Sequence, residues 1–139
     1  MDTRNKKFCA AKVRVTPAHD IKDAKYLVKH SKPKILVADK AYGAEWLHKY
    51  CYDNNIEAHI PIRNYGKVRF PKKLVSCRKK AAKMFRPRTY GRRSIGETGM
   101  WIVKGKYGGS VNSKKACTIK SEVYGGLLCH NLFGRFCVT

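Results

Sequence analysis

Four residues in the second half of the chain have a spacing that could serve phosphate chemistry. The pattern Y-x2-R-x3-E-x6-K, below called the signature, is formed by Tyr90, Arg93, Glu97 and Lys104. At about 100° per residue these side chains fall within about 60° of one another on a helix. Such a stripe is unusual for a core and suits a phosphate backbone held beside a metal ion. The alternative is a solvated face with an Arg93–Glu97 ion pair, which contributes only a few tenths of a kcal/mol.

A further candidate carboxylate follows a short apolar segment. Residues 35–38 (ILVA) form an unbroken apolar run, typical of a parallel strand buried on both faces. Asp39 comes next, at the carboxyl end of the expected strand, where open α/β sheets place their ligand sites. The alternative is that Asp39 caps the helix that follows. Asp39 and Glu97 occur in this order, 58 residues apart, in one small chain.

Together these residues resemble the catalytic part of DDE transposases from bacterial and archaeal insertion sequences. Asp39 lies in VADKAY, and the signature around Glu97 matches that family's helix at every specified position. The segments VTPAHDIKDAKYLV, IPIRN and KSEVYGGLLCHNLF are also similar to family segments, so the resemblance extends from about Lys7 to about Phe133. It implies a ribonuclease-H-like fold and DNA transposition by metal-dependent phosphodiester cleavage and strand transfer.

The resemblance also implies roles for individual residues. Asp39 and Glu97 would be catalytic carboxylates, the second and third acids of a triad that holds Mg²⁺ or Mn²⁺. Magnesium prefers oxygen ligands, and two such ions serve many nucleic-acid enzymes. Tyr90, Arg93 and Lys104 would grip the DNA backbone near the cut end, with water and a 3′-hydroxyl as nucleophiles.

The first acid of the triad has no clear counterpart in this sequence. In the family it lies on a strand before the segment that corresponds to residues 8–15. We therefore expect an N-terminally truncated ribonuclease-H-like domain, without its first strands, that binds DNA but does not cleave it alone. An intact nuclease would instead need Asp2 as the first ligand, and Mn²⁺-dependent nicking that is lost in Asp2→Ala would reveal it.

The elements that would position these residues alternate along the chain. Periodicity and turn residues predict strands at 8–15, 34–38 and 56–62, and helices at 21–30, 44–53, 89–103 and 114–133. Asp20 is the expected N-cap of the helix at 21–30. The short crossovers suit right-handed βαβ units, with parallel pairing of 34–38 and 56–61. We expect one α/β domain, made of a strand–helix core at 7–62, a basic insertion at 63–88 and a helical part at 89–139.

The last helix, at 114–133, has an apolar stripe that we expect to face the core. Its members are Ala116, Ile119, Val123, Leu127 and Cys129. Asn131 lies at the edge of this stripe. We interpret Asn131 as a hydrogen-bonding group at the core edge and not as a catalytic residue.

A basic stretch separates the predicted strands from the signature. Between Ala58 and Gly96 there is no acidic residue, whereas Lys and Arg number 13. Aromatic residues that could stack on unpaired bases are interleaved: Tyr65, Phe70, Phe85 and Tyr90. Because phosphate neutralisation dominates affinity for such surfaces, we expect further DNA contacts from Arg63, Arg69, Arg86, Arg88 and Arg92. The alternative is a solvated linker.

The charge of the whole chain favours nucleic acid as the partner. Of 139 residues, 31 are Lys or Arg and 9 are Asp or Glu, which gives a net charge of +22 and a self-repulsion that a polyanion relieves. No apolar run approaches the ~20 residues that span a bilayer, and residues 1–8 do not resemble a secretion signal. We expect a cytoplasmic, nucleoid-associated protein that binds transposon ends and target DNA and no membrane, with self-association in the DNA complex as a candidate. A non-enzymatic basic nucleic-acid-binding module is the alternative function.

The six cysteines are scattered, and none forms a C-x2-C pair. A zinc site usually shows such close ligand pairs. We therefore expect free thiols, as in most cytosolic proteins.

Overall fold

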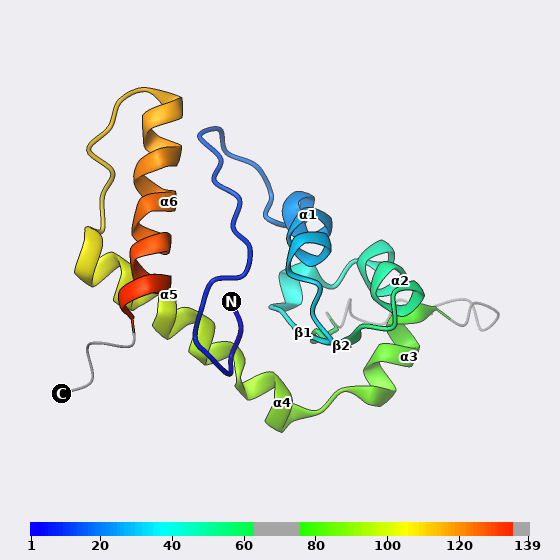
Figure 1. Ribbon diagram of the computed structural model, residues 1–139. Helices are drawn as coiled ribbons and strands as arrows, with labels where there is room; N and C mark the ends of the chain where they lie inside the picture. The colour runs from blue at the N-terminus through cyan, green and yellow to red at the C-terminus, as the bar shows by residue number, and fades with distance from the viewer. Residues whose placement is uncertain (63–75, 135–139) are drawn as a thin grey trace. The chain divides into compact units, whose positions relative to one another are not determined.

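The computed structural model describes residues 1–62 and 76–134 (Figure 1). The chain divides into two compact units. The strand unit spans residues 20–93, and the helical unit combines residues 1–19 with 94–139. Among the described residues, no helix is long and apolar enough to cross a membrane.

The strand unit is a parallel α/β arrangement. Its elements are α1 (Ile21–Ser31), β1 (Ile35–Val37), the 3-10 helix η1 (Lys40–Tyr42), α2 (Glu45–Asp53), β2 (Glu57–His59), α3 (Cys77–Met84) and α4 (Pro87–Gly91). β1 and β2 pair in parallel, with Ile35 opposite Glu57 and Val37 opposite His59. The chain passes between them through η1 and α2, since parallel strands need a crossover. The predicted α/β class and the parallel pairing are therefore confirmed.

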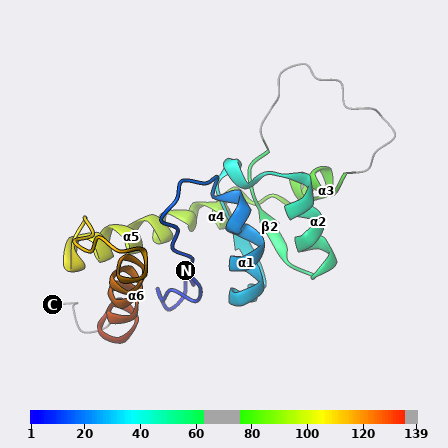
Figure 2. The same cartoon turned by 90° about the horizontal axis from the view of Figure 1, so that it is seen from above.

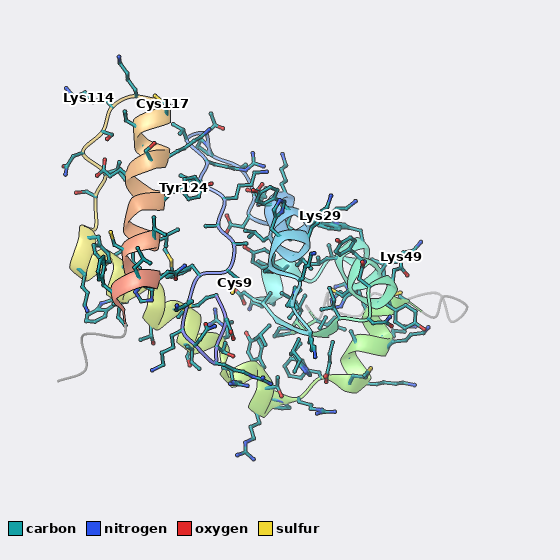
Figure 3. The ribbon with its side chains drawn as sticks, in the orientation of Figure 1. Cys9, Lys29, Lys49, Lys114, Cys117 and Tyr124 are labelled. Carbon is teal, nitrogen blue, oxygen red and sulfur yellow. The ribbon has the colours of Figure 1, made fainter. Side chains whose placement is uncertain are left out.

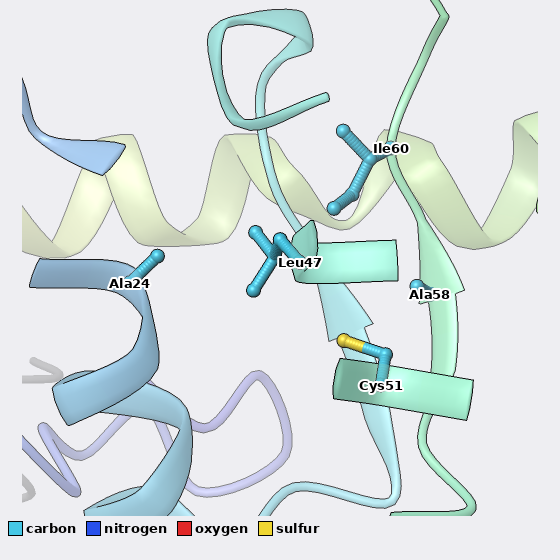
Figure 4. Close-up of a cluster of buried hydrophobic side chains, with 5 residues drawn as sticks. All are labelled: Ala24, Leu47, Cys51, Ala58 and Ile60. Atoms are coloured by element: carbon cyan, nitrogen blue, oxygen red, sulfur yellow. The ribbon is translucent and has the colours of Figure 1, made fainter. Parts of the chain in front are cut away.

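The core of the strand unit is a small apolar cluster between the helices and the sheet. It consists of Ala24, Leu47, Cys51, Ala58 and Ile60 (Figure 4). Leu47 and Cys51 lie four residues apart on one face of α2, and both are almost completely buried. Because successive strand residues point to opposite faces, Glu57 and His59 lie on the other face of β2 from Ala58.

The predicted helix at 21–30 is present as α1 and ends one residue later. The backbone N–H of Lys32, at a left-handed φ of 42°, bonds to the carbonyl of Val28, which satisfies one carbonyl of the last turn. The prediction that Asp20 caps this helix was wrong. Asp20 has helical backbone angles and makes no side-chain capping bond, because a capping side chain needs an extended backbone at that position.

The prediction of a strand buried on both faces at 34–38 was wrong in part. The strand covers Ile35–Val37, and Ile35 is 46% exposed. Double burial needs neighbouring strands and helices on both faces, whereas the sheet of the described residues contains two strands. The second predicted strand, at 56–62, is likewise shorter and covers Glu57–His59.

The helical unit contains α5 (Arg93–Tyr107), whose first residue closes the strand unit, and α6 (Ala116–Phe133). A loop joins the two helices (Figure 2), and it turns at Gly108, which has a φ of 101° that favours glycine. The carboxylate of Glu122 accepts the backbone N–H groups of Asn112 and Ser113, both at 3.0 Å. These hydrogen bonds tie the end of the loop to α6. The side-chain hydrogen bond of Ser113, together with these two N–H groups, holds the pKa of Glu122 below its ordinary value.

The predicted single helix at 89–103 was wrong, because the chain forms two helices there. α4 ends at Gly91, and the N–H of Arg92 bonds to the carbonyl of Thr89, three residues back, instead of continuing the α-helical pattern. Tyr90 therefore lies on α4, while the other three signature residues lie on α5. The helix expected at 114–133 is confirmed as α6.

The predicted strand at 8–15 was also wrong. This segment is bound to α6 by helix side chains. The Asn131 amide accepts the N–H of Phe8 at 2.8 Å and donates to the Phe8 carbonyl at 2.9 Å, and the Tyr124 hydroxyl (labelled in Figure 3) accepts the N–H of Val13 at 3.3 Å. An amide side chain thus takes the place that a neighbouring strand would have. The interpretation of Asn131 as a hydrogen-bonding group is confirmed.

The apolar stripe of α6 is confirmed except at its first residue. Leu127 is buried and Ile119, Val123 and Cys129 are half-buried, whereas Ala116 is exposed. Ala116 is the first residue of the helix, so it lies beyond the part of α6 that packs.

The thiols that the structure describes are free, as expected. They are Cys9, Cys51, Cys77, Cys117 and Cys129, and Cys137 lies outside the described residues. Burial raises the pKa of Cys51 to about 11.

Candidate active-site carboxylates and nucleic-acid interface

Asp39 lies at the carboxyl end of β1, where the sequence predicted it. It is exposed, and its Oδ1 accepts the backbone N–H of Lys40 at 2.7 Å, so that Asp39 is also the N-cap of η1. The alternative interpretation of Asp39 as a cap is therefore confirmed, while its role as a ligand stays a prediction. A carboxylate has lone pairs on both oxygens, so the capping bond does not prevent Asp39 from binding a cation.

The surroundings of Asp39 are acidic. Burial raises the pKa of the nearby Tyr42 hydroxyl, and the carboxylates of Asp20, Asp23 and Asp39 raise it further. All three acids therefore act on one phenol at this end of the strand unit. A local negative field of this kind attracts cations, and hard carboxylate oxygens are the ligands that Mg²⁺ prefers. The donor chemistry at Asp39 fits a divalent ion.

Glu97 lies on α5 in the helical unit and is exposed. Arg93, Glu97 and Lys104 follow one another along this helix, and their spacing keeps them on one face. Lys104 is exposed in the last turns of α5, where a cation interacts favourably with the helix dipole. Three of the four signature residues therefore share one helix, whereas the spacing predicted all four on one helix.

Within residues 1–62 and 76–134, no group of three or more His, Cys, Asp or Glu side chains is arranged to hold a metal ion. Asp39 belongs to the strand unit and Glu97 to the helical unit. Their assignment as metal ligands stays a prediction.

Tyr90 and Arg93 are in contact across the break between α4 and α5. The Arg93 guanidinium lies 5.9 Å from the centroid of the Tyr90 ring, within the range of a cation–π interaction. The Tyr90 ring also lies 5.5 Å from the ring of Phe85, measured between centroids. The aromatic and cationic members of the signature therefore form one local cluster with Phe85, although they occupy two helices.

Arg86 precedes α4 and contacts β2. Its backbone N–H bonds to Nδ1 of His59 at 3.2 Å, and its Nε lies 3.7 Å from Oε1 of Glu57. The Arg86 side chain is nevertheless 70% exposed, so this contact leaves most of it accessible. An ion pair so exposed to solvent contributes at most about 1 kcal/mol.

The remaining predicted DNA contacts divide into two groups. Arg88, on α4, and Arg92, at the break, are exposed, as phosphate contacts must be. Arg63 and Arg69 lie outside the described residues. Nearby, Lys79, Lys80 and Lys83 of α3 are also exposed, so basic side chains continue along α3 and α4.

Two residues of this region, Glu57 and His59, were not among the residues singled out in the sequence. They lie two positions apart on β2, on the face of this strand that Arg86 contacts. The signal was present, because a Glu and a His interrupt the apolar strand segment IEAHIPI and share one face at this spacing. Their partners Phe85 and Arg86 follow after more than 25 residues and could not be assigned from the pattern.

A comparison with protein families identifies the family of the chain. The family model described as the transposase DDE domain matches residues 1–132. The chain belongs to the DDE transposase family. The match includes Asp39 and the whole signature, so the resemblance noted in the sequence is confirmed. No curated protein and no solved structure matches the chain.

Membership of the DDE transposase family gives the chain its general function, DNA transposition. The family acts on DNA and generally uses a divalent metal.

Proposed function

We propose that this DDE transposase chain takes part in metal-dependent phosphodiester cleavage and strand transfer, with Asp39 and Glu97 as metal-holding carboxylates. The observation that carries the proposal is the position of Asp39. In a chain matched by the family over residues 1–132, Asp39 follows the carboxyl end of β1, a strand of a parallel pair, which is where α/β folds place their ligand sites.

When bound, Mg²⁺ or Mn²⁺ would neutralise charge on the scissile phosphate and make water or a 3′-hydroxyl a better nucleophile. The chain's own carboxylates contribute negative charge at two positions. The carboxylate of Asp39 is held in place because its Oδ1 accepts the backbone N–H of Lys40. Fixing a ligand in this way reduces the entropy that is lost when it binds.

The DNA backbone would be bound by Tyr90, Arg93 and Lys104, supported by exposed Arg86, Arg88 and Arg92. Arg63 and Arg69 belong to the same proposal. A guanidinium can donate two parallel hydrogen bonds to a phosphate, and stacking on Tyr90 orients the guanidinium of Arg93. The excess of cations over the whole chain supplies the non-specific part of the affinity. We place the protein, as part of this proposal, in the cytoplasm with the nucleoid.

Binding of Mn²⁺ tests the metal assignment without requiring cleavage. Paramagnetic broadening of backbone amide signals should be largest near Lys40 and Tyr42 when Mn²⁺ is added to the full chain. Asp39→Asn should remove this broadening, because the amide keeps the shape and the capping acceptor but loses the charge. Asp53→Asn, at the exposed end of α2, is the matched control. Equal broadening in the Asp39→Asn and unaltered proteins would rule out Asp39 as a ligand.

The alternative is a basic module that coats nucleic acid, with Asp39 and Glu97 purely structural. Its supporting observation is that Asp39 already serves as the cap of η1. This alternative predicts that DNA binding is unaffected by Mn²⁺ and by Asp39→Asn. The transposase proposal predicts tighter binding of DNA ends with Mn²⁺, lost in Asp39→Asn.

A further inference from the structure

His59 is the most deeply buried polar side chain described in the strand unit. It is 0% exposed, and it lies on the face of β2 that is turned away from the apolar core. Its ring is contacted by Glu57, by the backbone of Arg86 and by the Phe85 ring. A buried imidazole with contacts to the chain just before α4 can fix the position of that chain.

The contacts of His59 define its tautomer. The backbone N–H of Arg86 can only donate, so the Nδ1 that it meets at 3.2 Å must be an unprotonated acceptor. The neutral ring then carries its proton on Nε2, which lies 3.1 Å from Oε1 of Glu57 without being aligned with it for a hydrogen bond. The same carboxylate oxygen lies 3.7 Å from Nε of Arg86. Arg86 is thus held through its backbone by His59 and through its side chain by Glu57.

A row of rings connects His59 to the signature. The His59 and Phe85 rings are edge to face, with centroids 6.2 Å apart. The centroids of Phe85 and Tyr90 are 5.5 Å apart, and the guanidinium of Arg93 lies 5.9 Å from the centroid of Tyr90. Edge-to-face and offset ring pairs at these separations attract one another. The row begins at a side chain with no exposure and ends at the signature cation.

From this geometry we propose that His59 is a positioning residue for DNA binding, which acts through Arg86 and Phe85 to hold Tyr90 and Arg93 in place. This inference rests on the proposed role of Tyr90 and Arg93 at the DNA backbone. The physical advantage is preorganisation. A free arginine side chain loses rotamer freedom when it binds a phosphate, and a side chain already held against a fixed ring loses less.

Three substitutions separate the contacts of His59. His59→Phe keeps an aromatic ring against Phe85 but removes both polar contacts. His59→Asn places an amide oxygen near the position of Nδ1 and can still accept the N–H of Arg86. His59→Gln places an amide nitrogen near the position of Nε2 and keeps a polar group beside Glu57, but it loses the bond to Arg86.

Binding of a fluorescent DNA duplex to the full chain provides the first readout. His59→Phe and His59→Gln should weaken binding by about fivefold, since the net contribution of one ordinary hydrogen bond corresponds to roughly that change in an equilibrium constant. The slope of log K against log salt should fall by about 0.9, because Arg93 would no longer neutralise its phosphate. His59→Asn should restore most of the affinity and of the slope. If His59 only stabilised the fold, these substitutions would leave the slope of log K against log salt unchanged.

Phe85→Leu supplies a second test that leaves His59, Glu57 and Arg86 intact. It breaks the row of rings and should lower the salt slope as His59→Phe does. The control is His48→Phe, which alters another buried histidine of the same unit, on α2, and should leave the slope unchanged. Nitrogen-15 chemical shifts of the imidazole should show Nδ1 unprotonated in the unaltered protein.

Two results would overturn the inference. One is a folded His59→Phe or Phe85→Leu protein that binds DNA with the unaltered affinity and salt slope. The other is an imidazole protonated on Nδ1. A different result would show that the proposed role of Tyr90 and Arg93 at the DNA backbone is itself wrong. In that case Arg93→Ala and Tyr90→Ala would leave DNA binding unchanged in a protein with His59 intact.

Discussion

The guanidinium of Arg93 lies over the ring of Tyr90, 5.9 Å from its centroid, although the two residues belong to different helices. A continuous helix would also have brought them together, because residues three apart lie on the same side. Here Arg92 separates α4 from α5, and the contact is kept. The spacing of the first two signature residues is therefore compatible with a helix break.

Replacing Arg93 by Ala should weaken binding to duplex DNA and lower the salt slope by about 0.9, the value for one phosphate contact. Arg93→Lys should restore the slope but only part of the affinity, because an ammonium lacks the planar fork of the guanidinium. The measurement is fluorescence anisotropy over a range of salt concentrations. Lys49→Ala on α2 (Figure 3) removes the same charge at another exposed position, and an equal effect there would mean that only net charge matters.

Replacing Asp39 separates capping from metal binding. Asp39→Ala removes the acceptor for the N–H of Lys40 and should destabilise the strand unit by about 0.5–2 kcal/mol, the usual effect of losing an N-cap. Asp39→Asn keeps the acceptor and should cost much less. Urea unfolding in the absence of divalent metal measures both. Equal destabilisation by the two substitutions would show that the carboxylate charge, and not the capping bond, stabilises this region.

His48 should make the chain less stable in acid. It is 2% exposed, and neither ring nitrogen has a hydrogen-bond partner among the described residues. Burial lowers its pKa below 6.5, Arg78 lowers it further, and Glu45 partly opposes the shift. The unfolded chain therefore binds a proton at His48 more readily than the folded chain does. Because protonation then favours the unfolded state, the free energy of unfolding should fall as the pH drops below about 6.5.

His48→Leu tests this assignment. The leucine has a similar volume and cannot be protonated, so it should raise the melting temperature more at pH 5.5 than at pH 7.5. His30→Leu, which alters an exposed histidine of α1, is the control. A His48→Leu protein whose melting temperature depends on pH as steeply as that of the unaltered chain would contradict the prediction.

Asn131 should hold the N-terminal segment against α6. Asn131→Ala removes both bonds to the Phe8 backbone and should cost about 1–3 kcal/mol, because two half-buried backbone groups lose their partners. Hydrogen exchange at the Phe8 amide should accelerate strongly. Asn131→Asp can still accept the N–H of Phe8 but cannot donate to its carbonyl, so protection of that amide should be intermediate. Unchanged exchange in Asn131→Ala would mean that other contacts hold the segment.

Local sequence patterns located most of the helices and both strands of the sheet. Apolar positions four residues apart, such as Leu47 and Cys51, and the stop at Lys32-Pro33 predicted α1 and α2 to within one residue at each end. They failed at residues 8–15, because an alternating pattern shows that a segment can pair but not what it pairs with. In the folded chain the partner is Asn131, 123 residues away from Phe8.

The sequence by itself determined the family, the parallel βαβ pairing and the position of Asp39 at a strand end, since each depends on residue types at short, fixed spacings. Only the tertiary structure decided that α4 and α5 are separate helices, that Asp39 caps η1, and that His59 meets Arg86, 27 residues further along the chain. Hydrogen bonds between distant residues depend on how the elements pack. Packing is a property of the whole folded unit, and no local pattern of side chains encodes it.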